Sequence, residues 1–476
     1  MESDPRRWQA LALVCVAFFM TVLDVSIVNV ALPSIGRSLH FSETGLQWVI
    51  TAYAITFGGF LLLGGRTADI LGRKRIFLAG VLLFSAASLV CGLSGSAGVL
   101  VAARAVQGLG AAIVSPATLS IITTTFEEGA ERNKALGIWG AMGGSGAAAG
   151  VLFGGILTKY LGWEWIFFVN VPVGALVLAL APRVVRESRA PGERQGFDVV
   201  GAGSVTAGLA LLVYAISKAP VDGWANGTTI GLLIGSAAIL AFFVLWEARV
   251  PKPIMPLGIF RIRTLAGANI VGVLLGASVF ANFFLLTLYV QNVLGFSALK
   301  TGLTFLATAG TTVIVAGLSQ WLTTKIGPRP VMAAGMALNT AGLVWYAHIP
   351  VHGSYTRDLL PGYLLVGFGL ALAFIPVSIA ALAGVGPRDA GLASGLINTA
   401  QQVGGAIGVA IASSVAVSRA THLLHTGSSQ AAALTHGYAL AFWVVAGVSA
   451  AGVVTSLALV RGEEPVGEEE PVEAFG

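Results

Sequence analysis

Long apolar stretches separated by short polar segments run along almost the whole chain. A helix needs about 20 mostly apolar residues to cross the hydrocarbon core of a membrane, and fourteen stretches meet this requirement. They are 8–33, 46–65, 76–95, 98–122, 133–158, 163–186, 198–217, 228–249, 265–291, 300–322, 330–350, 361–385, 392–418 and 437–460. The pattern therefore predicts an all-α polytopic membrane protein with 14 transmembrane helices.

The composition agrees with this interpretation. Of the 476 residues, 56% are hydrophobic and only 10% are charged, whereas soluble domains have about 25% charged residues. Too few charges remain to cover a water-facing surface or to neutralise phosphates. A soluble enzyme, a disordered chain and a nucleic-acid-binding protein are thereby excluded, and the expected surroundings are membrane lipids.

The distribution of basic residues predicts the orientation. An even number of spans puts both termini on one side of the membrane. If that side is the cytoplasm, most of the 27 lysines and arginines lie in cytoplasmic segments, as the positive-inside rule requires. We therefore expect a multi-pass protein of the cell membrane with cytoplasmic N- and C-termini, in which the net charge of +5 reflects topology.

Weak internal similarity divides the chain into two halves. The loop 71–75 resembles the loop 326–330, and the glycines of the fifth stretch resemble those of the thirteenth. The two pairs of segments are separated by nearly the same number of residues. This predicts two six-helix bundles with two additional helices between them. The expected domains are an N-terminal bundle (1–190), two additional helices with linkers (191–260), a C-terminal bundle (261–460) and an acidic, disordered cytoplasmic tail (461–476).

Duplicated six-helix halves are typical of secondary transporters, in which the halves rock about a site near the middle of the membrane. No lysine of the chain lies in a G-x-x-x-x-G-K-[ST] motif, so the sequence gives no sign of a nucleotide-driven pump. We expect no cofactor and no enzymatic activity, with an ion gradient as the source of energy.

Asp24 is the one acidic residue deep within a predicted span. A charge there costs at least about 2.5–3.5 kcal/mol and usually marks an ion or substrate path. Because a carboxyl group removed from water can exchange a proton near neutral pH, Asp24 is the predicted proton carrier. The alternative is a structural role, in which Asp24 hydrogen-bonds the first span to a neighbour.

Arg104 is the matching cation in the fourth span. At 1.5 Å per residue, Asp24 and Arg104 lie roughly 13 and 9 Å below the outer surface, close enough to interact. Gln107 follows Arg104 by one helical turn and could extend the network. We expect the three residues to form a proton-coupling site.

The first span reads Leu-Asp-Val-Ser-Ile-Val-Asn-Val-Ala-Leu-Pro at 23–33, which resembles the first-helix motif of the fourteen-helix drug:proton antiporters of the major facilitator superfamily. The loop 65–74 is similar to the superfamily signature G-x-x-x-D-x-x-G-R-K. The resemblance implies a cytoplasmic gating motif, a latch that breaks when the halves rock. Its residues are Gly65, Asp69, Gly72, Arg73 and Lys74.

Two further motifs extend the resemblance over nearly the whole chain. Residues 104–112 match the family's proton-coupling motif, which implies coupling roles for Arg104 and Gln107. Residues 146–155 resemble the antiporter motif, but Val151 replaces its proline; Glu164 similarly stands where the branch usually has arginine. The antiporter-motif glycines are Gly146, Gly150, Gly154 and Gly155.

The resemblance also implies a substrate cavity lined by spans 1, 4, 9 and 12. The candidate cavity residues, besides the coupling site, are Asn29, Asn282, Phe283, Tyr289, Gln291, Phe374 and Pro376. Such a lining predicts a large, mainly apolar pocket with few polar anchors. No metal site is expected, since His422 and His425 are interpreted as solvated residues in or near an outer loop.

These observations predict a monomeric, proton-coupled antiporter that exports small lipophilic drugs or antibiotics in exchange for protons by alternating access. One alternative is an uptake symporter or facilitator. Another is a transport-inactive receptor or membrane scaffold, which gives no reason for charges at Asp24 and Arg104.

Overall fold

The computed structural model describes residues 6–41, 46, 48–189, 198–251, 253, 255–386 and 389–460, and this part of the chain contains helices but no strand. The N-terminal half has α1 (Arg7–Ser38), α3 (Trp48–Leu71), α4 (Arg73–Gly92), α5 (Ala97–Thr125), α6 (Ala130–Tyr160), α7 (Trp165–Phe168) and α8 (Asn170–Val184). The insertion has α9 (Val199–Asp222) and α10 (Gly227–Glu247). The C-terminal half has η1 (Leu257–Arg261), α11 (Arg263–Leu288), η2 (Tyr289–Val293), α12 (Ala298–Ile326), α13 (Pro328–Tyr346), η3 (Tyr355–Leu359), α14 (Leu360–Leu382), α15 (Ala390–His425) and α16 (Gln430–Leu459).

Within the described ranges, 12 helical segments are long and apolar enough to cross a membrane. Each coincides with one of the predicted stretches. The two remaining stretches, 133–158 and 330–350, coincide with α6 and α13, which are not among the 12. An all-helical membrane protein is therefore confirmed with 12 candidate spans, and the count of 14 stays a prediction.

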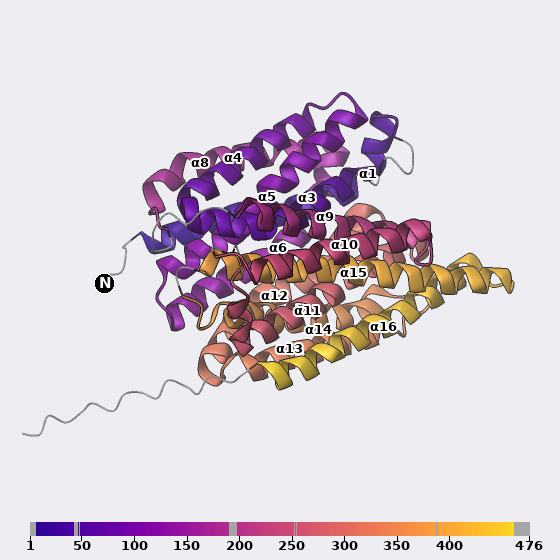
Figure 1. Ribbon diagram of the computed structural model, residues 1–476. Coiled ribbons are helices and arrows are strands. Elements are labelled where there is room, and N and C mark those ends of the chain that lie inside the picture. Colours follow the sequence, from indigo (N-terminus) through magenta and orange to yellow (C-terminus); the bar gives the residue numbers. More distant parts are fainter. Residues whose placement is uncertain are drawn as a thin grey trace, which may run out of the picture.

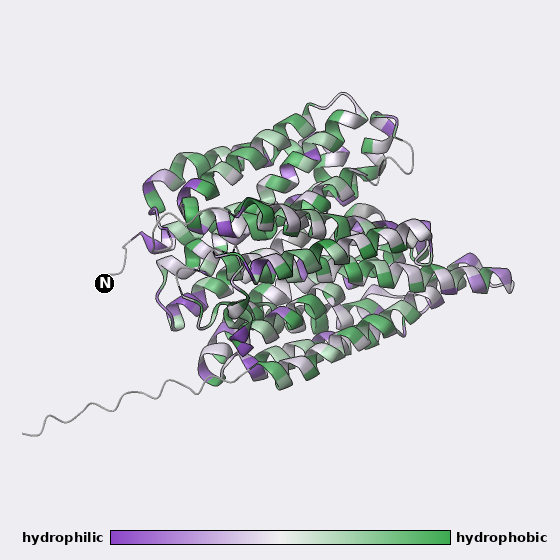
Figure 2. Ribbon diagram, in the orientation of Figure 1, coloured by the Kyte–Doolittle hydropathy of each residue, from purple (hydrophilic) through white to green (hydrophobic). Residues whose placement is uncertain are grey.

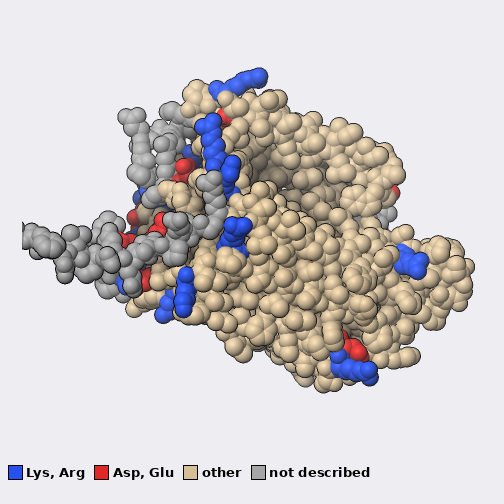
Figure 3. Space-filling view, turned by 90° about the horizontal axis from the view of Figure 1, so that it is seen from below, with Lys and Arg blue, Asp and Glu red and all other residues tan. Residues whose placement is uncertain are grey.

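The long helices lie side by side, and the start of α1 and the end of α16 lie at the same end of the molecule (Figure 1). We call this end the terminal end. Hydrophobic residues predominate along the helices (Figure 2). Charged side chains gather at the two ends, mostly the terminal one, and leave a broad uncharged band between them (Figure 3). This distribution fits helices that cross a membrane lengthwise.

The insertion contacts both halves of the molecule. α10 packs on α9, and α9 packs on α3 and α15. On α3, Gly59 allows the close approach, because a Cβ atom there would lie 3.1 Å from the Cβ of Ala210. Near the opposite end, the Trp224 indole donates a hydrogen bond of 2.6 Å to Ser414 Oγ on α15. Residues 191–197 and the acidic tail 461–476 lie outside the described residues, and the domain boundaries stay predictions.

The sixth predicted span consists of two helices separated by one residue, Val169, whose backbone dihedral angles are also helical. α7 ends at Phe168, and α8 begins at Asn170. Pro172 has no N–H to complete the helical hydrogen bond to the Phe168 carbonyl, which explains the missing bond between the two helices. Asn170 is the first residue of α8.

α15 is longer than the predicted thirteenth span. It continues beyond residue 418 to His425, so His422 and His425 lie in its last turn, exposed, and not in a loop. The helix leaves the apolar band without a residue that would break it, and the chain turns only at Gly427, where φ is +87°. Glycine adopts this left-handed conformation without steric cost.

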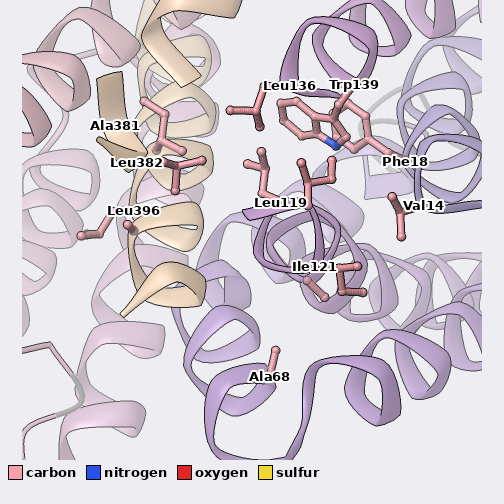
Figure 4. Packing of buried hydrophobic residues seen from close by; sticks show 14 of the residues in the cluster. Val14, Phe18, Ala68, Leu119, Ile121, Leu136, Trp139, Ala381, Leu382 and Leu396 are labelled. Atoms are coloured by element: carbon pink, nitrogen blue, oxygen red, sulfur yellow. The ribbon is translucent and has the colours of Figure 1, made fainter. Parts of the chain in front are cut away.

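Buried apolar side chains show where the two halves meet. The largest cluster combines residues of both halves near the terminal end, including Val14, Leu119 and Leu136 of the N-terminal half and Ala381, Leu382 and Leu396 of the C-terminal half (Figure 4). Toward the opposite end, one cluster contains only residues 281–446 and another only residues 23–167. The halves therefore share an apolar core at the terminal end, and toward the opposite end they meet where α6 packs on α12.

Candidate coupling site

Asp24 lies on α1 and is fully buried. Its Oδ2 accepts a hydrogen bond of 2.6 Å from Arg104 Nη1 on α5. Its Oδ1 accepts bonds of 2.8 Å from Gln107 Nε2 and 2.9 Å from Asn170 Nδ2. The contact expected from the depths of Asp24 and Arg104 is therefore present, and three helices of the N-terminal half converge on the carboxylate.

Arg104 is held on several sides. Besides Asp24, its Nη1 donates to Gln107 Oε1 at 2.7 Å, and its Nε donates to the Val49 carbonyl at 3.0 Å. The guanidinium carbon lies 4.2 Å from the centre of the Tyr53 ring, an arrangement in which the ring face attracts the cation. Through Val49 and Tyr53, α3 also contributes to the site.

Ser88 on α4 forms a second layer. Its hydroxyl accepts hydrogen bonds of 3.1 Å from Gln107 and 3.0 Å from Asn170. It donates a bond of 2.9 Å to the Phe167 carbonyl on α7. The sequence analysis missed three residues of this site: Ser88, Asn170 and Tyr53. The sequence marks them only as neutral polar residues within apolar stretches, which does not distinguish them from other such residues.

The whole network is shielded from water. Asp24, Gln107 and Ser88 are 0% exposed, and Arg104 and Asn170 are 1% exposed. Buried charges are tolerated when they are paired and hydrogen-bonded, and three donors surround the carboxylate here. The hydrogen-bonding capacity of the buried Asp24 carboxylate is therefore met by side chains from two neighbouring helices.

The predicted antiporter-motif glycines bring α6 close to α1 beside this network. At Gly150, a Cβ atom would lie 2.6 Å from the Leu23 carbonyl oxygen and from the Cβ of Ser26. Gly146 and Gly154 also face α1, whereas Gly155 faces Leu299 on α12. α6 passes through Val151 without a break. Small residues permit close packing of helices in membranes. The first three glycines therefore allow α6 to pack closely on α1, and Gly155 allows it to pack closely on α12.

Asp69 joins the two halves at the terminal end. Its Oδ1 accepts a hydrogen bond of 2.6 Å from Arg73 Nη2 and one of 3.3 Å from Ser120 Oγ. Its Oδ2 accepts a bond of 3.2 Å from the backbone N–H of Leu392, in the first turn of α15. A carboxylate at a helix N-terminus is stabilised by the helix dipole. Asp69 thus pairs with an arginine of its own half and caps a helix of the other.

Of the other gating-motif residues, Gly65 lies at the same contact between the halves, whereas Gly72 and Lys74 lie next to Glu187 of the N-terminal half. A side chain at Gly65 would collide with the Gly391 carbonyl of α15. Gly72 has φ +115°, and the backbone N–H of Lys74 donates to Glu187 Oε1 at 3.1 Å. Arg66 adds an ion pair with Asp389 across the two halves, with an N–O distance of 3.3 Å.

The predicted cavity residues differ in burial in this conformation. Asn29 is exposed and its amide donates to the Val25 carbonyl, while Phe283, Gln291 and Phe374 are partly buried. Asn282 and Pro376 are buried. Tyr289 is fully buried in the C-terminal half, and its hydroxyl donates to the Pro350 carbonyl at 2.6 Å.

The C-terminal half contains an uncharged network on the corresponding helices. Asn339 on α13 donates hydrogen bonds of 3.0 Å to Ser278 on α11 and to Ser449 on α16. These are the first, third and sixth long helices of their half, as α1, α4 and α8 are of theirs. The charged network therefore has a neutral counterpart.

Comparison with known proteins identifies the family. Residues 14–409 match the model of the Major Facilitator Superfamily. The chain belongs to this superfamily. Among its relatives are the puromycin resistance protein pur8 of Streptomyces alboniger, 39% identical over 98% of this chain and 94% of the relative, and the cephamycin export protein CmcT of Amycolatopsis lactamdurans, 41% identical over 84% of this chain and 83% of the relative.

A solved structure supports the fold of this superfamily member. The human organic anion transporter MFSD10 has a TM-score of 0.67 and 16% identity, and the match covers 95% of this chain and 100% of that one. Further relatives include the tetracenomycin C resistance and export protein of Streptomyces glaucescens, 34% identical over 87% of this chain and 77% of the relative. The chain is therefore a multi-pass transporter rather than an enzyme, and several of its relatives are antibiotic resistance and export proteins.

Proposed function

We propose that this protein is a proton-coupled antiporter that exports lipophilic antibiotics or drugs from the cytoplasm. The observation that supports this most directly is the buried network of Asp24, Arg104 and Gln107 in a chain whose relatives are named for antibiotic export. In this proposal 14 helices cross the cell membrane, the terminal end faces the cytoplasm, and the working unit is a monomer.

The mechanism follows from the position of the shared apolar core. Because the halves are joined at the terminal end, we assign this conformation to the outward-facing state of alternating access. A proton from outside is added to the Asp24 carboxylate once the network opens, which ends its ion pair with Arg104. The halves then part at the terminal end, where cytoplasmic cargo binds and Asp24 releases the proton.

Asp69 contributes to the same cycle as a latch. Its hydrogen bond to the Leu392 N–H and the ion pair between Arg66 and Asp389 span the two halves. Both contacts must break before the terminal end can open.

The test uses inverted membrane vesicles with an imposed pH gradient and a panel containing puromycin, tetracenomycin C and lincomycin. The parent protein should accumulate at least one compound. Asp24→Asn keeps the side-chain shape but cannot take up a proton, so accumulation against a gradient should disappear. Asp24→Glu should retain part of it, and Asp222→Asn, at an exposed carboxyl, should not affect it. Equal accumulation by the Asp24→Asn variant would show that Asp24 is structural.

A further inference from the structure

Three aromatic rings meet where the halves are joined. Phe18 lies on α1, Trp139 on α6 and Phe374 on α14. The ring centres of Phe18 and Trp139 are 4.2 Å apart with an angle of 22° between the planes. Those of Trp139 and Phe374 are 6.0 Å apart with an angle of 26°. Both phenyl rings therefore stack on the same indole.

Two of these rings belong to the N-terminal half and one to the C-terminal half. Phe18 and Trp139 lie next to each other in the shared core (Figure 4), and they are 6% and 2% exposed. The indole Nε1 donates a hydrogen bond of 3.1 Å to Thr118 Oγ1 on α5. Because these contacts lie within one half, they fix the orientation of the indole independently of the other half.

Phe374 is the ring that must leave when the halves part at the terminal end. It is only partly buried, and α14 brings it to the indole from the C-terminal half. Its departure uncovers the part of the indole that it now covers. An uncovered indole next to a cytoplasmic opening is a large apolar surface with a preference for stacked rings.

Two glycines of α6 face the space that Phe374 fills in this conformation. Gly140 directly follows Trp139 and Gly143 lies one helical turn beyond it, and a Cβ atom at Gly140 would lie 3.4 Å from the Phe374 ring. A Cβ atom at Gly143 would lie 3.7 Å from both the Phe18 and the Phe374 rings. The site also lies about 9 Å from Asp24 along α1, near the residue that releases the proton.

We infer that Trp139 is the stacking platform for a planar aromatic group of the cargo, and that Phe374 occupies the platform when no cargo is bound. The inference rests on the proposed export function and names its substrate class. Cargo with a flat ring system replaces Phe374 on the indole in the inward-facing state. Return to the outward-facing state restores Phe374 and displaces the cargo.

The test compares two cationic probes with the purified protein: ethidium, which is planar and aromatic, and cetyltrimethylammonium, which has no ring. Trp139→Leu should weaken ethidium binding about tenfold and change cetyltrimethylammonium binding less than about twofold, as expected for loss of an aromatic contact. Trp139→Phe should retain most of the ethidium affinity. Trp321→Leu is the matched control, since Trp321 is 51% exposed on α12.

Phe374→Leu provides a second variant that leaves Trp139 intact. It removes the ring that competes with the cargo and weakens the closed terminal end, so ethidium should bind more tightly. Three results would each overturn the inference. The first is an equal loss of affinity for both probes in Trp139→Leu, the second is unchanged ethidium affinity in that variant, and the third is no ethidium binding by the parent protein. If ethidium binds in a way that depends on Trp139 but does not accumulate in vesicles under a pH gradient, the proposed export function would be refuted. The inference that Trp139 is a stacking platform would be retained.

Discussion

At Asp24 and Arg104, two opposite charges neutralise each other where water does not reach. Burying such a pair is favourable only when the remaining polar atoms are also satisfied, and Gln107, Asn170 and the Val49 carbonyl complete the hydrogen bonds. Removing one partner leaves an uncompensated charge, which typically costs about 3–5 kcal/mol. The neutral residues of the site thus matter as much as the ions.

Arg104→Ala tests the coupling of the two charges. Without the cation, the Asp24 carboxyl should hold its proton more tightly, and the activity profile should shift toward higher pH. Initial rates of transport in inverted vesicles, measured across a range of pH, report this shift. Arg75→Ala is the control, because the Arg75 side chain is 71% exposed. An unchanged profile for Arg104→Ala would show that the residues are not coupled.

The residues of the site differed in how far they could be predicted. Asp24 and Arg104 were recognisable because a charge in an apolar stretch is rare and costly. Asn170 and Ser88 were not, since neutral polar residues are common in spans and reveal no partner. Asn170 reaches Asp24 because α8 packs on α1, and hydropathy does not reveal which helices are neighbours.

At the scale of elements, the distance between α1 and α6 is set by glycines beside the coupling site. Gly150→Val should destabilise the protein by about 1–3 kcal/mol, the usual cost of overpacking, because its Cβ would meet backbone atoms of α1. Thermal unfolding in detergent measures this. Gly310→Val on α12 is a matched control, since no atom lies within 4 Å of a Cβ there. Equal melting of the two variants would contradict close packing at Gly150.

The contact of α3 with α15 makes a second prediction. Asp69→Asn removes the charge that pairs with Arg73 and caps α15. The closed terminal end, which these contacts stabilise, should then re-form less readily after cargo has bound, so the return to the outward-facing state should slow. Cargo affinity should stay nearly unchanged, because Asp69 lies near the terminal end, away from the coupling site. Measurements of cargo affinity and of transport rate separate an effect on binding from an effect on the transitions. Glu131→Gln, at an exposed site, is the control. A large loss of affinity with normal turnover would refute the latch.

Most helices lie where the apolar stretches predicted them, because about 20 apolar residues are a strong signal for a span. The length and hydropathy of a stretch do not predict which helices contact one another. The repeat of apolar residues does not say that α9 packs on both α3 and α15, or that Trp224 bonds to Ser414. Nor could it give the extension of α15 to His425, which lies outside the apolar band.

At the scale of the molecule, the number of crossings can be tested with single introduced cysteines. If α6 crosses the membrane, Gly129→Cys and Leu161→Cys should react with a membrane-impermeant maleimide from opposite sides, with Gly129→Cys on the cytoplasmic side. Gly327→Cys and His352→Cys should do the same for α13. The native Cys15 and Cys91 are buried, so background labelling should be low. Labelling of either pair from one side would refute the count of 14.

The burial of Asp24 also bears on the membrane in which the protein works. If a carrier's acidic residue were exposed to water on both sides of the membrane, protons would cross without cargo. Such a leak would dissipate the proton gradient of the cell. Here the carboxylate lies beneath three donors and is 0% exposed. Under the proposed mechanism, a transporter that rests in this conformation does not leak protons, so many copies can reside in one membrane without dissipating the proton gradient.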